Sequence, residues 1–401
     1  METISPDVAA WLATAEGLAW LDRAPASGAT PAVVSRLRAE LTATRVSAVL
    51  EVAEARLRGA AKFPRAAQML LTRRGVEQST DSWISDYKAR RFDGFDSVID
   101  LGCGVGGDLL GLSGVVKASV GIEADATLAA FAQHNLNTDA HWVAVHHRVA
   151  DTRAVEGFSA WHVDPDRRPQ GRRTVRLEAS APSLDTIESW RSQQPSFCAK
   201  LAPAATAPPA WAESGELEWI SRDGECRQQV AWGGALATTD GCRRATRVFG
   251  GVGRPSRAPV SFAGEPALDP QAAERPDTYV FEPDASVLAA DLTGALAASH
   301  GLRRLGGVAY LTGDRAIVDP LLASFWVIET MPLDRRRLAD WLRRRGVGAL
   351  EIKCRGVDVS PQRLRAELKP KGDAPMTLLL CPTMGAARKP LVIAAHRSEP
   401  A

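Results

Sequence analysis

The chain has 401 residues, of which 45% are hydrophobic and 24% are charged, and its formal net charge is +2 at pH 7. This length suits two or three domains that each bury a core. Nothing in the whole-chain charge demands a polyanionic partner, and no apolar run approaches the ~18–20 residues that span a bilayer. The acids Glu2 and Asp7 argue against a secretory signal. We therefore expect a cytoplasmic globular protein without membrane contact.

The N-terminal part, residues 1–92, is predicted to be a helical region. Alanine, leucine, arginine and glutamate dominate it, and apolar residues recur at helical spacing, as at Val33, Leu37 and Leu41. Asp81 is expected to cap a further helix. This region is predicted to cover a ligand pocket as a lid.

Residues 93–263 are predicted to form an α/β domain. Apolar segments that suit buried strands alternate with helical stretches such as 127–136, which indicates parallel βαβ units. An Asp223-Gly224 turn between two strand-like runs then predicts an antiparallel hairpin at the end of the sheet. The five predicted parallel strands lie in residues 97–104, 118–125, 142–151, 159–166 and 196–203.

The remaining residues are predicted to form a linker and a further domain. Residues 250–276 are rich in glycine, proline, alanine and serine, which is typical of a linker. Residues 278–401 alternate helix-like with strand-like stretches. We therefore expect a small α+β domain over 278–401.

A glycine-rich turn follows the first predicted strand, within residues 98–108. Gly102, Gly104 and Gly106 allow tight turning and close approach of a ligand to the backbone. No Lys-Ser/Thr pair follows, so the turn is not a phosphate-binding P-loop. Asp100 precedes the glycines and suits S-adenosylmethionine (SAM), which carries a cationic amino group and sulfonium and no phosphate.

Two further acids follow the next two predicted strands. Glu123, with its neighbour Ala124, lies about 20 residues past the first glycine, where an acid can bind both ribose hydroxyls. Asp151, with Thr152, ends the third predicted strand, where the class I methyltransferases that this stretch resembles hold the adenine amino group. For any one of these acids alone, a helix cap or a loop residue is a simpler interpretation than a SAM ligand. Three acids at successive strand ends on one sheet edge predict a SAM pocket.

The fourth predicted strand ends in Asp164-Pro165-Asp166-Arg167-Arg168. In the class I methyltransferases that this stretch resembles, the groups that hold the acceptor lie at this position. Asp164 and Pro165 are expected to orient an acceptor amine, and Arg167 to stack on a base or pair with phosphate. Arg168 is a further candidate for substrate contact. A structural turn with surface arginines is the alternative.

The stretch from Asp100 to Asp164 resembles class I SAM-dependent methyltransferases with a Rossmann-like sheet. The wider chain is similar to an actinobacterial family of such enzymes that carry a C-terminal THUMP-like domain. The resemblance implies SAM as cofactor and, by analogy with THUMP domains, an RNA substrate. The segments that carry it are KFPRAAQMLLTRRGVEQST, ARRF, DLGCGVGGD, HVDPDRR, KLAP and EPD…IKCRGVD.

Residues 62–92 also distantly resemble the lead-in of trimethylguanosine synthases, a stretch that folds over the SAM site. This resemblance implies that Lys62 and Phe63 contact substrate. The Trp of the DPPW motif in those enzymes is missing here, which argues against cap methylation. Uridine C5 methyltransferases share a similar DPxR, but their cysteine would fall at Leu201, which argues against covalent catalysis.

Charge is concentrated near the C-terminus. Residues 335–401 hold fifteen Lys/Arg and six Asp/Glu, although the whole chain is near neutral. A basic surface attracts phosphate backbones, and Lys353 and Arg355 are the best candidates for a specific contact. Solvated arginines on a helix face are the alternative.

These patterns predict a SAM-dependent methyltransferase that acts on RNA by direct transfer. The alternatives are a small-molecule methyltransferase whose C-terminal domain makes subunit contacts, and a SAM- or RNA-binding protein without catalysis. No CxxC pair exists among the six cysteines, and the histidines lack partners at ligand spacing, so no metal ion is expected. The oligomeric state is not indicated.

Overall fold

The computed structural model describes residues 4–24, 30–136, 142–166, 180–255, 257–305, 308, 310–383 and 389–398. The chain forms two compact units. The first comprises Met1–Asp223, Arg227–Cys242 and Val248–Pro259, and the second Gly224–Cys226, Arg243–Arg247 and Val260–Ala401. The helical region therefore belongs to the same unit as the methyltransferase sheet, while the three-part division stays a prediction.

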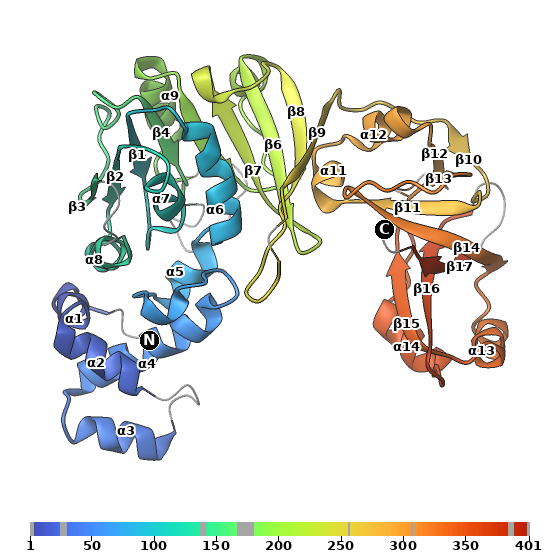
Figure 1. Ribbon diagram of the computed structural model, residues 1–401, viewed down its shortest axis with the longest axis horizontal. Helices are drawn as coiled ribbons and strands as arrows, with labels where there is room; N and C mark the ends of the chain where they lie inside the picture. The colour runs from blue at the N-terminus through green and yellow to red at the C-terminus, as the bar shows by residue number, and fades with distance from the viewer. Residues whose placement is uncertain are drawn as a thin grey trace. The chain divides into compact units, whose positions relative to one another are not determined.

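Within its described residues, the N-terminal region of the first unit contains six α-helices (Figure 1). Several begin after a threonine whose hydroxyl accepts a backbone N–H, and Asp81 caps α6 in the same way through the Ile84 amide at 3.1 Å, as predicted. No helix among the described residues is both long and apolar enough to cross a membrane. The elements are α1 (Pro6–Leu12), α2 (Ala15–Arg23), α3 (Pro31–Arg38), α4 (Ala43–Gly59), η1 (Ala66–Gln68), α5 (Arg73–Gln78), α6 (Ser82–Ala89) and η2 (Arg90–Phe92).

Seven strands of one sheet follow in the order β3-β2-β1-β4-β5-β7-β6. The first five are parallel neighbours, and β7 runs antiparallel to β5. The Rossmann-like sheet with an antiparallel terminal hairpin is thus confirmed. The strands are β1 (Ser97–Leu101), β2 (Ala118–Glu123), β3 (Trp142–His147), β4 (Ala160–Val163), β5 (Phe197–Leu201), β6 (Gly215–Arg222) and β7 (Glu225–Gly233).

Helices cover both faces of this sheet, as parallel strands require. Neighbouring residues of β4 face opposite sides, so His162 points to α6 and α7 while the Trp161 ring packs on Trp190 of α9. Figure 1 shows α6 beside α7. The helices of this part are α7 (Gly107–Leu112), α8 (Ala126–Asn135), α9 (Leu184–Gln193), α10 (Pro209–Glu213) and η4 (Gly234–Leu236).

The third strand is shorter than predicted. We expected residues 142–151, but β3 ends at His147 because its parallel partner β2 ends at Glu123, the residue paired with His147. Asp151 therefore lies in a turn beyond the strand, and its placement at the end of the third strand was wrong.

The predicted hairpin turn is confirmed. Asp223 and Gly224 join β6 to β7, with φ values of 54° and 79°. Two consecutive residues with positive φ fit the type I′ turn whose twist matches the flanking strands. The Asp-Gly pair supplies them at low steric cost.

The second unit contains an eight-stranded sheet in the order β10-β12-β13-β11-β14-β17-β16-β15. The predicted linker 250–276 was wrong in part, because β9 and β10 lie within it. The residues of β9 alternate between apolar and polar, and the strand pairs antiparallel with β8. It forms although the surrounding sequence is rich in glycine and proline. The elements are β8 (Cys242–Arg247), β9 (Val260–Gly264), β10 (Ala272–Ala273), β11 (Tyr279–Pro283), α11 (Ala285–Ala289), α12 (Thr293–His300), β12 (Arg303–Leu305), β13 (Tyr310–Gly313), β14 (Leu322–Pro332), α13 (Arg335–Arg344), β15 (Val347–Cys354), α14 (Pro361–Leu368), β16 (Ala374–Cys381) and β17 (Leu391–Arg397).

Helices α13 and α14 cover one face of this second sheet. Leu338 and Trp341 of α13 and Leu364 of α14 are buried against apolar side chains of β15, β16 and β17. The arginines of α13 lie on its opposite, exposed side. This amphipathic arrangement explains how one short helix can carry so many cations. The small α+β domain is therefore confirmed as a fold.

Asn135 at the end of α8 joins the helical region to the glycine turn. Its Oδ1 accepts from the Leu70 amide at 2.7 Å, and its Nδ2 donates to the carbonyls of Leu70 and Val105 at 3.0 and 2.9 Å. The side chain is 5% exposed. One amide thus pairs three buried backbone groups from two distant segments.

We predict that Asn135→Ala lowers the free energy of unfolding by about 3 kcal/mol, because unpaired buried backbone groups cost ~1–3 kcal/mol each. Urea denaturation measures the change. Ser192→Ala, which removes an exposed hydroxyl that bonds only within its own helix, is the control. Equal stability of the two variants would contradict the assigned role of Asn135.

Candidate functional site

The glycine turn links β1 to α7. Gly102, Gly104 and Gly106 have φ values of 79°, 59° and 91°, a region that side chains with a Cβ rarely adopt. Gly106 is also the residue that caps α7, so the free amides of the first turn begin there. All three predicted glycines therefore have a conformational reason to be glycine.

Glu123 lies at this turn, as its position after β2 predicted. Its Oε2 accepts from the Gly104 amide at 2.8 Å and its Oε1 from the Asp125 amide at 2.9 Å. Burial raises the pKa of Glu123, although these backbone bonds oppose the shift. Each carboxylate oxygen keeps a further lone pair, so the group remains able to accept from ribose hydroxyls.

Asp151 is connected to Glu123 through Arg148. The Arg148 amide donates to the Glu123 carbonyl at 3.0 Å, and its guanidinium lies 3.2 Å from Asp151 Oδ2. Asp151, Ala124 and Thr152 are exposed. These three positions are therefore open to solvent, and Arg148 links Asp151 to Glu123.

Asp100 is the most deeply buried of the predicted acids, with an exposed fraction of 1%. Its Oδ1 lies 2.7 Å from His162 Nδ1, and its Oδ2 has no hydrogen-bond partner among the described residues. A buried carboxylate oxygen without a donor is costly. This oxygen, the glycine turn and Glu123 together fit a ligand with one cationic group and vicinal hydroxyls, which describes SAM.

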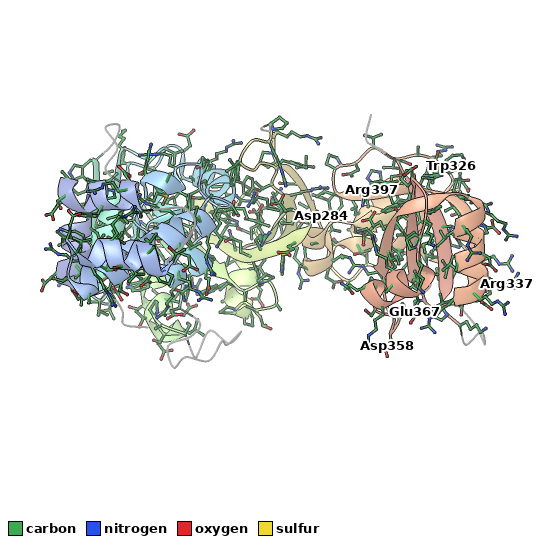
Figure 2. The ribbon with its side chains drawn as sticks, turned by 90° about the horizontal axis from the view of Figure 1, so that it is seen from below. Asp284, Trp326, Arg337, Asp358, Glu367 and Arg397 are labelled. Atoms are coloured by element: carbon green, nitrogen blue, oxygen red, sulfur yellow. The ribbon has the colours of Figure 1, made fainter. Side chains whose placement is uncertain are left out.

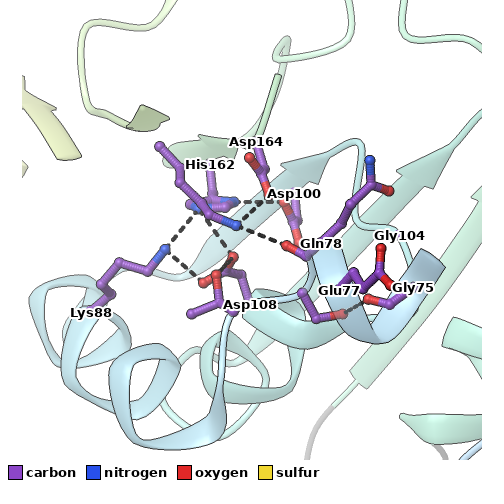
Figure 3. A network of polar contacts seen from close by, with 12 residues as sticks. Gly75, Glu77, Gln78, Lys88, Asp100, Gly104, Asp108, His162 and Asp164 are labelled. Atoms are coloured by element: carbon purple, nitrogen blue, oxygen red, sulfur yellow. Dashed lines mark hydrogen bonds and ion pairs between the residues drawn. The ribbon is translucent and has the colours of Figure 1, made fainter. Parts of the chain in front are cut away.

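Asp100 belongs to a buried network of four ionisable side chains (Figure 3). Lys88 Nζ lies 2.6 Å from Asp108 Oδ1 and 3.3 Å from His162 Nε2, and that Nε2 lies 3.8 Å from Asp108 Oδ2. Thr80 donates to Asp108 at 2.7 Å. The network thus joins β1, β4, α6 and α7.

The charges in this network support one another. Burial alone lowers the pKa of His162, but Asp100 and Asp108 raise it to about 10 against the opposing effect of Lys88. Burial raises the pKa of Asp108, but Lys88 and His162 hold it well below its usual range. Asp108 is therefore an anion, and His162 and Lys88 are cations, at neutral pH.

Asp164 lies directly after β4, opposite the glycine turn. Its Oδ2 is 2.5 Å from Lys200 Nζ of β5, and the same ammonium donates to the Gln78 carbonyl at 3.3 Å. A Cβ on Gly102 would lie 3.6 Å from the Asp164 carbonyl oxygen. The predicted acceptor residue and the predicted donor turn are therefore adjacent (Figure 3).

The rest of the acceptor motif is described in part. Pro165 is buried, and Asp166 Oδ2 lies 3.0 Å from the Arg74 guanidinium of α5. Arg167 and Arg168 lie outside the described residues. Helix α5 therefore meets the acceptor segment at Asp166.

Lys62 holds the end of α5. Its ammonium donates to the carbonyls of Val76 and Ser79, both at 2.7 Å, and to Glu77 at 3.3 Å. Burial, followed by the nearby charge of Lys200, lowers the pKa of Lys62 to about 8. The Lys62 ammonium donates to three backbone carbonyls. Its role near the acceptor segment is therefore to hold the backbone at the end of α5.

Phe63, the other substrate candidate next to Lys62, is a core residue. Its ring is 1% exposed and packs in the apolar cluster of the helical region. The ring therefore contributes to the core directly after Lys62 in the chain. Its predicted contact with substrate stays untested.

Lys353 and Arg355 lie in the second unit and share one carboxylate. Lys353 Nζ is 2.6 Å from Glu282 Oε2, and Arg355 is 3.1 Å from Glu282 Oε1. This ion pair brings together the EPD and IKCRGVD segments, which are far apart in the sequence. Both cations are thus partly neutralised.

The sequence prediction missed several residues of the site. His162 lies in the segment HVDPDRR and Lys200 in KLAP, but neither side chain was predicted as a site residue. An ionisable residue at the centre of a buried strand, as His162 is, signals a polar partner. Lys88 had no signal, because helical spacing does not show which lysine turns inward.

Comparisons with known proteins agree with this geometry. The family model THUMP domain-like matches residues 322–397. The uncharacterized S-adenosylmethionine-dependent methyltransferases of Mycobacterium tuberculosis strains CDC 1551 and H37Rv are 30% identical over 323 residues, covering 78% of this chain and 85% of each relative. A crystal structure of a candidate methyltransferase from Porphyromonas gingivalis W83 matches with a TM-score of 0.76 at 22% identity, covering 100% of both chains, and shows the same fold.

The sheet order, the glycine turn and the acids at its edge define a class I SAM-dependent methyltransferase, and SAM is its cofactor. The chain belongs to the family of the two mycobacterial methyltransferases and carries, like the family that its sequence resembles, a C-terminal THUMP-like domain.

We predict that Lys88→Met lowers the free energy of unfolding by about 3–5 kcal/mol, because it leaves the buried Asp108 carboxylate without its cation. Urea denaturation followed by fluorescence measures the change. Lys117→Met is the matched control, since the Lys117–Asp96 pair is 83% and 75% exposed and water replaces it. A Lys88 variant as stable as the control would show that the pair does not stabilise the fold.

Proposed function

We propose that this enzyme transfers the methyl group of SAM to a nucleophile of RNA, such as a base amine. The observation that supports the proposal is the proximity of Asp164 to the glycine turn, because a carboxylate that binds the acceptor there would lie beside the bound donor. The exposed basic surface of the THUMP-like domain supports RNA as the substrate class.

The first unit would hold the donor through its predicted acids. Asp100 would accept from the methionine amino group, Glu123 from the ribose hydroxyls, and Asp151 from the adenine amino group. Bound SAM supplies an electrophilic methyl group on a positively charged sulfur. The protein then contributes by orientation, which can lower a barrier by several kcal/mol.

Asp164 would receive the acceptor. Its carboxylate can accept a hydrogen bond from an amine or hydroxyl and so direct the lone pair of that group towards the donor. Lys200 neutralises the carboxylate and keeps its orientation. Arg74, at 3.0 Å from Asp166, places a guanidinium at the edge of this segment, where a phosphate would be attracted.

The RNA-binding surface would be formed by α13 and α14. These helices contact each other, and an ion pair of 2.6 Å between Arg335 and Glu367 joins them. Figure 2 shows Arg337 pointing away from this domain. Its unpaired cations form what we call the α13–α14 basic surface. These residues are exposed and form no ion pair with a described residue: Arg336, Arg337, Arg344, Arg363, Arg365 and Lys369.

Asp164→Ala should lower the rate of methyl transfer by about 100-fold, because a misplaced acceptor loses the advantage of orientation. SAM affinity, measured by calorimetry, should stay near the wild-type value. The test begins with mass spectrometry of nucleosides from a strain that lacks the gene.

One methylated nucleoside should be absent from that strain, restored by the wild-type gene and by the surface control Asp96→Ala, and not by Asp164→Ala. An unchanged set of methylated nucleosides would refute RNA methylation. It would leave a small-molecule acceptor, with the THUMP-like domain used for subunit contacts, or a protein without catalysis.

Arg336→Gln combined with Arg337→Gln should weaken RNA binding and reduce its dependence on salt. Each lost phosphate contact lowers the slope of log affinity against log salt by about 0.7–0.9. Fluorescence anisotropy at several salt concentrations measures both effects. Arg36→Gln with Arg38→Gln on α3 removes the same charge elsewhere, and an equal loss in both double variants would contradict a surface specific to α13 and α14.

A further inference from the structure

His162 is the one member of the buried network that touches both of its carboxylates. It lies in the centre of β4, and its backbone is in register with Asp100 on the neighbouring parallel strand β1. Paired positions on parallel strands project to the same face. The short contact between Nδ1 and Asp100 Oδ1, 2.7 Å, is therefore fixed by the sheet itself.

The far side of the ring is held as firmly. Nε2 lies 3.3 Å from Lys88 Nζ and 3.8 Å from Asp108 Oδ2, and all four residues are at least nine-tenths buried. Figure 3 shows the ring between Asp100 on one side and the Lys88–Asp108 pair on the other. Turning the imidazole would break the contact of Nδ1 with Asp100 and the ion pair of Nε2 with Asp108.

The consequence falls on Asp100. With Oδ1 bound by the ring, the carboxylate plane is set, and Oδ2 is the oxygen that remains without a donor. Asp100 precedes the glycine turn by two residues, so Oδ2 is the oxygen of Asp100 that is left for a ligand at the predicted SAM site. A carboxylate that is oriented before its ligand arrives binds more tightly, because less rotational freedom is lost on binding.

We propose that His162 is a positioning residue for SAM: it orients Asp100 so that Oδ2 accepts the amino group of the methionine part. Asp108, which Lys88 holds through a 2.6 Å ion pair, holds His162 in turn, which makes α6 of the helical region part of the donor site. The proposal rests on SAM as cofactor and does not depend on the acceptor. Its test is therefore independent of the test of RNA methylation.

The test compares two ligands on the full-length protein by calorimetry. S-adenosylhomocysteine carries the amino group, whereas 5′-methylthioadenosine lacks the whole amino-acid part. His162→Gln, whose amide lies nearer the Nε2 position, should weaken S-adenosylhomocysteine binding by about 10- to 100-fold, the loss expected when one hydrogen bond to a charged group is removed. Its affinity for 5′-methylthioadenosine should not change.

His162→Asn is the matched variant, because its amide NH₂ lies near the position of Nδ1 and can still donate to Asp100. It should retain most of the affinity for S-adenosylhomocysteine. Equal losses for both ligands, or a His162→Gln variant that binds both like the wild type, would overturn the proposal.

A measurement on the wild-type protein avoids the risk that a variant does not fold. With ¹⁵N-labelled histidine, the His162 ring nitrogens should shift more on addition of S-adenosylhomocysteine than of 5′-methylthioadenosine. Identical shifts with the two ligands would also overturn the proposal.

Discussion

The contact between Asp100 and His162 is the constraint on which the rest of the first unit depends. Two ionisable side chains in the middle of adjacent buried strands would be prohibitively costly alone. Paired at 2.7 Å they still need a second cation and a second anion, which Lys88 and Asp108 provide. Because these come from α6 and α7, the position of both helices over the sheet is set by charge as well as by apolar packing.

The helical region is consequently part of the site rather than an addition to it. The backbone carbonyls of residues 76–79 are held by two ammonium groups, Lys62 from one side and Lys200 from the other. Lys200 also binds Asp164. Lys200 thus joins the backbone after α5 to the proposed acceptor carboxylate. A displacement of that backbone would therefore also displace the carboxylate, and the reverse.

The sequence was sufficient to predict those site residues whose role follows from the neighbouring residues in the chain. The turn at Gly102, its acid Asp100 and the strand-end acid Glu123 could be found because glycine conformation and strand alternation follow residue by residue. His162 and Lys88 could not, since their role arises only when β4 lies beside β1 and α6 covers both. The strand at residues 260–264 was missed for a similar reason, because pairing with β8 prevailed over a composition typical of linkers.

Charge serves opposite purposes in the two units. In the first, four buried charges nearly cancel, and removing one exposes the others to a low dielectric, so the network is stiff and intolerant of change. In the second, most cations of α13 and α14 are exposed, where an ion pair contributes only ~0–1 kcal/mol. Such cations exchange partners at little cost. A surface of this kind can release counterions to a phosphate backbone without disturbing the fold that carries it, whereas the donor site must hold its charges fixed to orient a ligand.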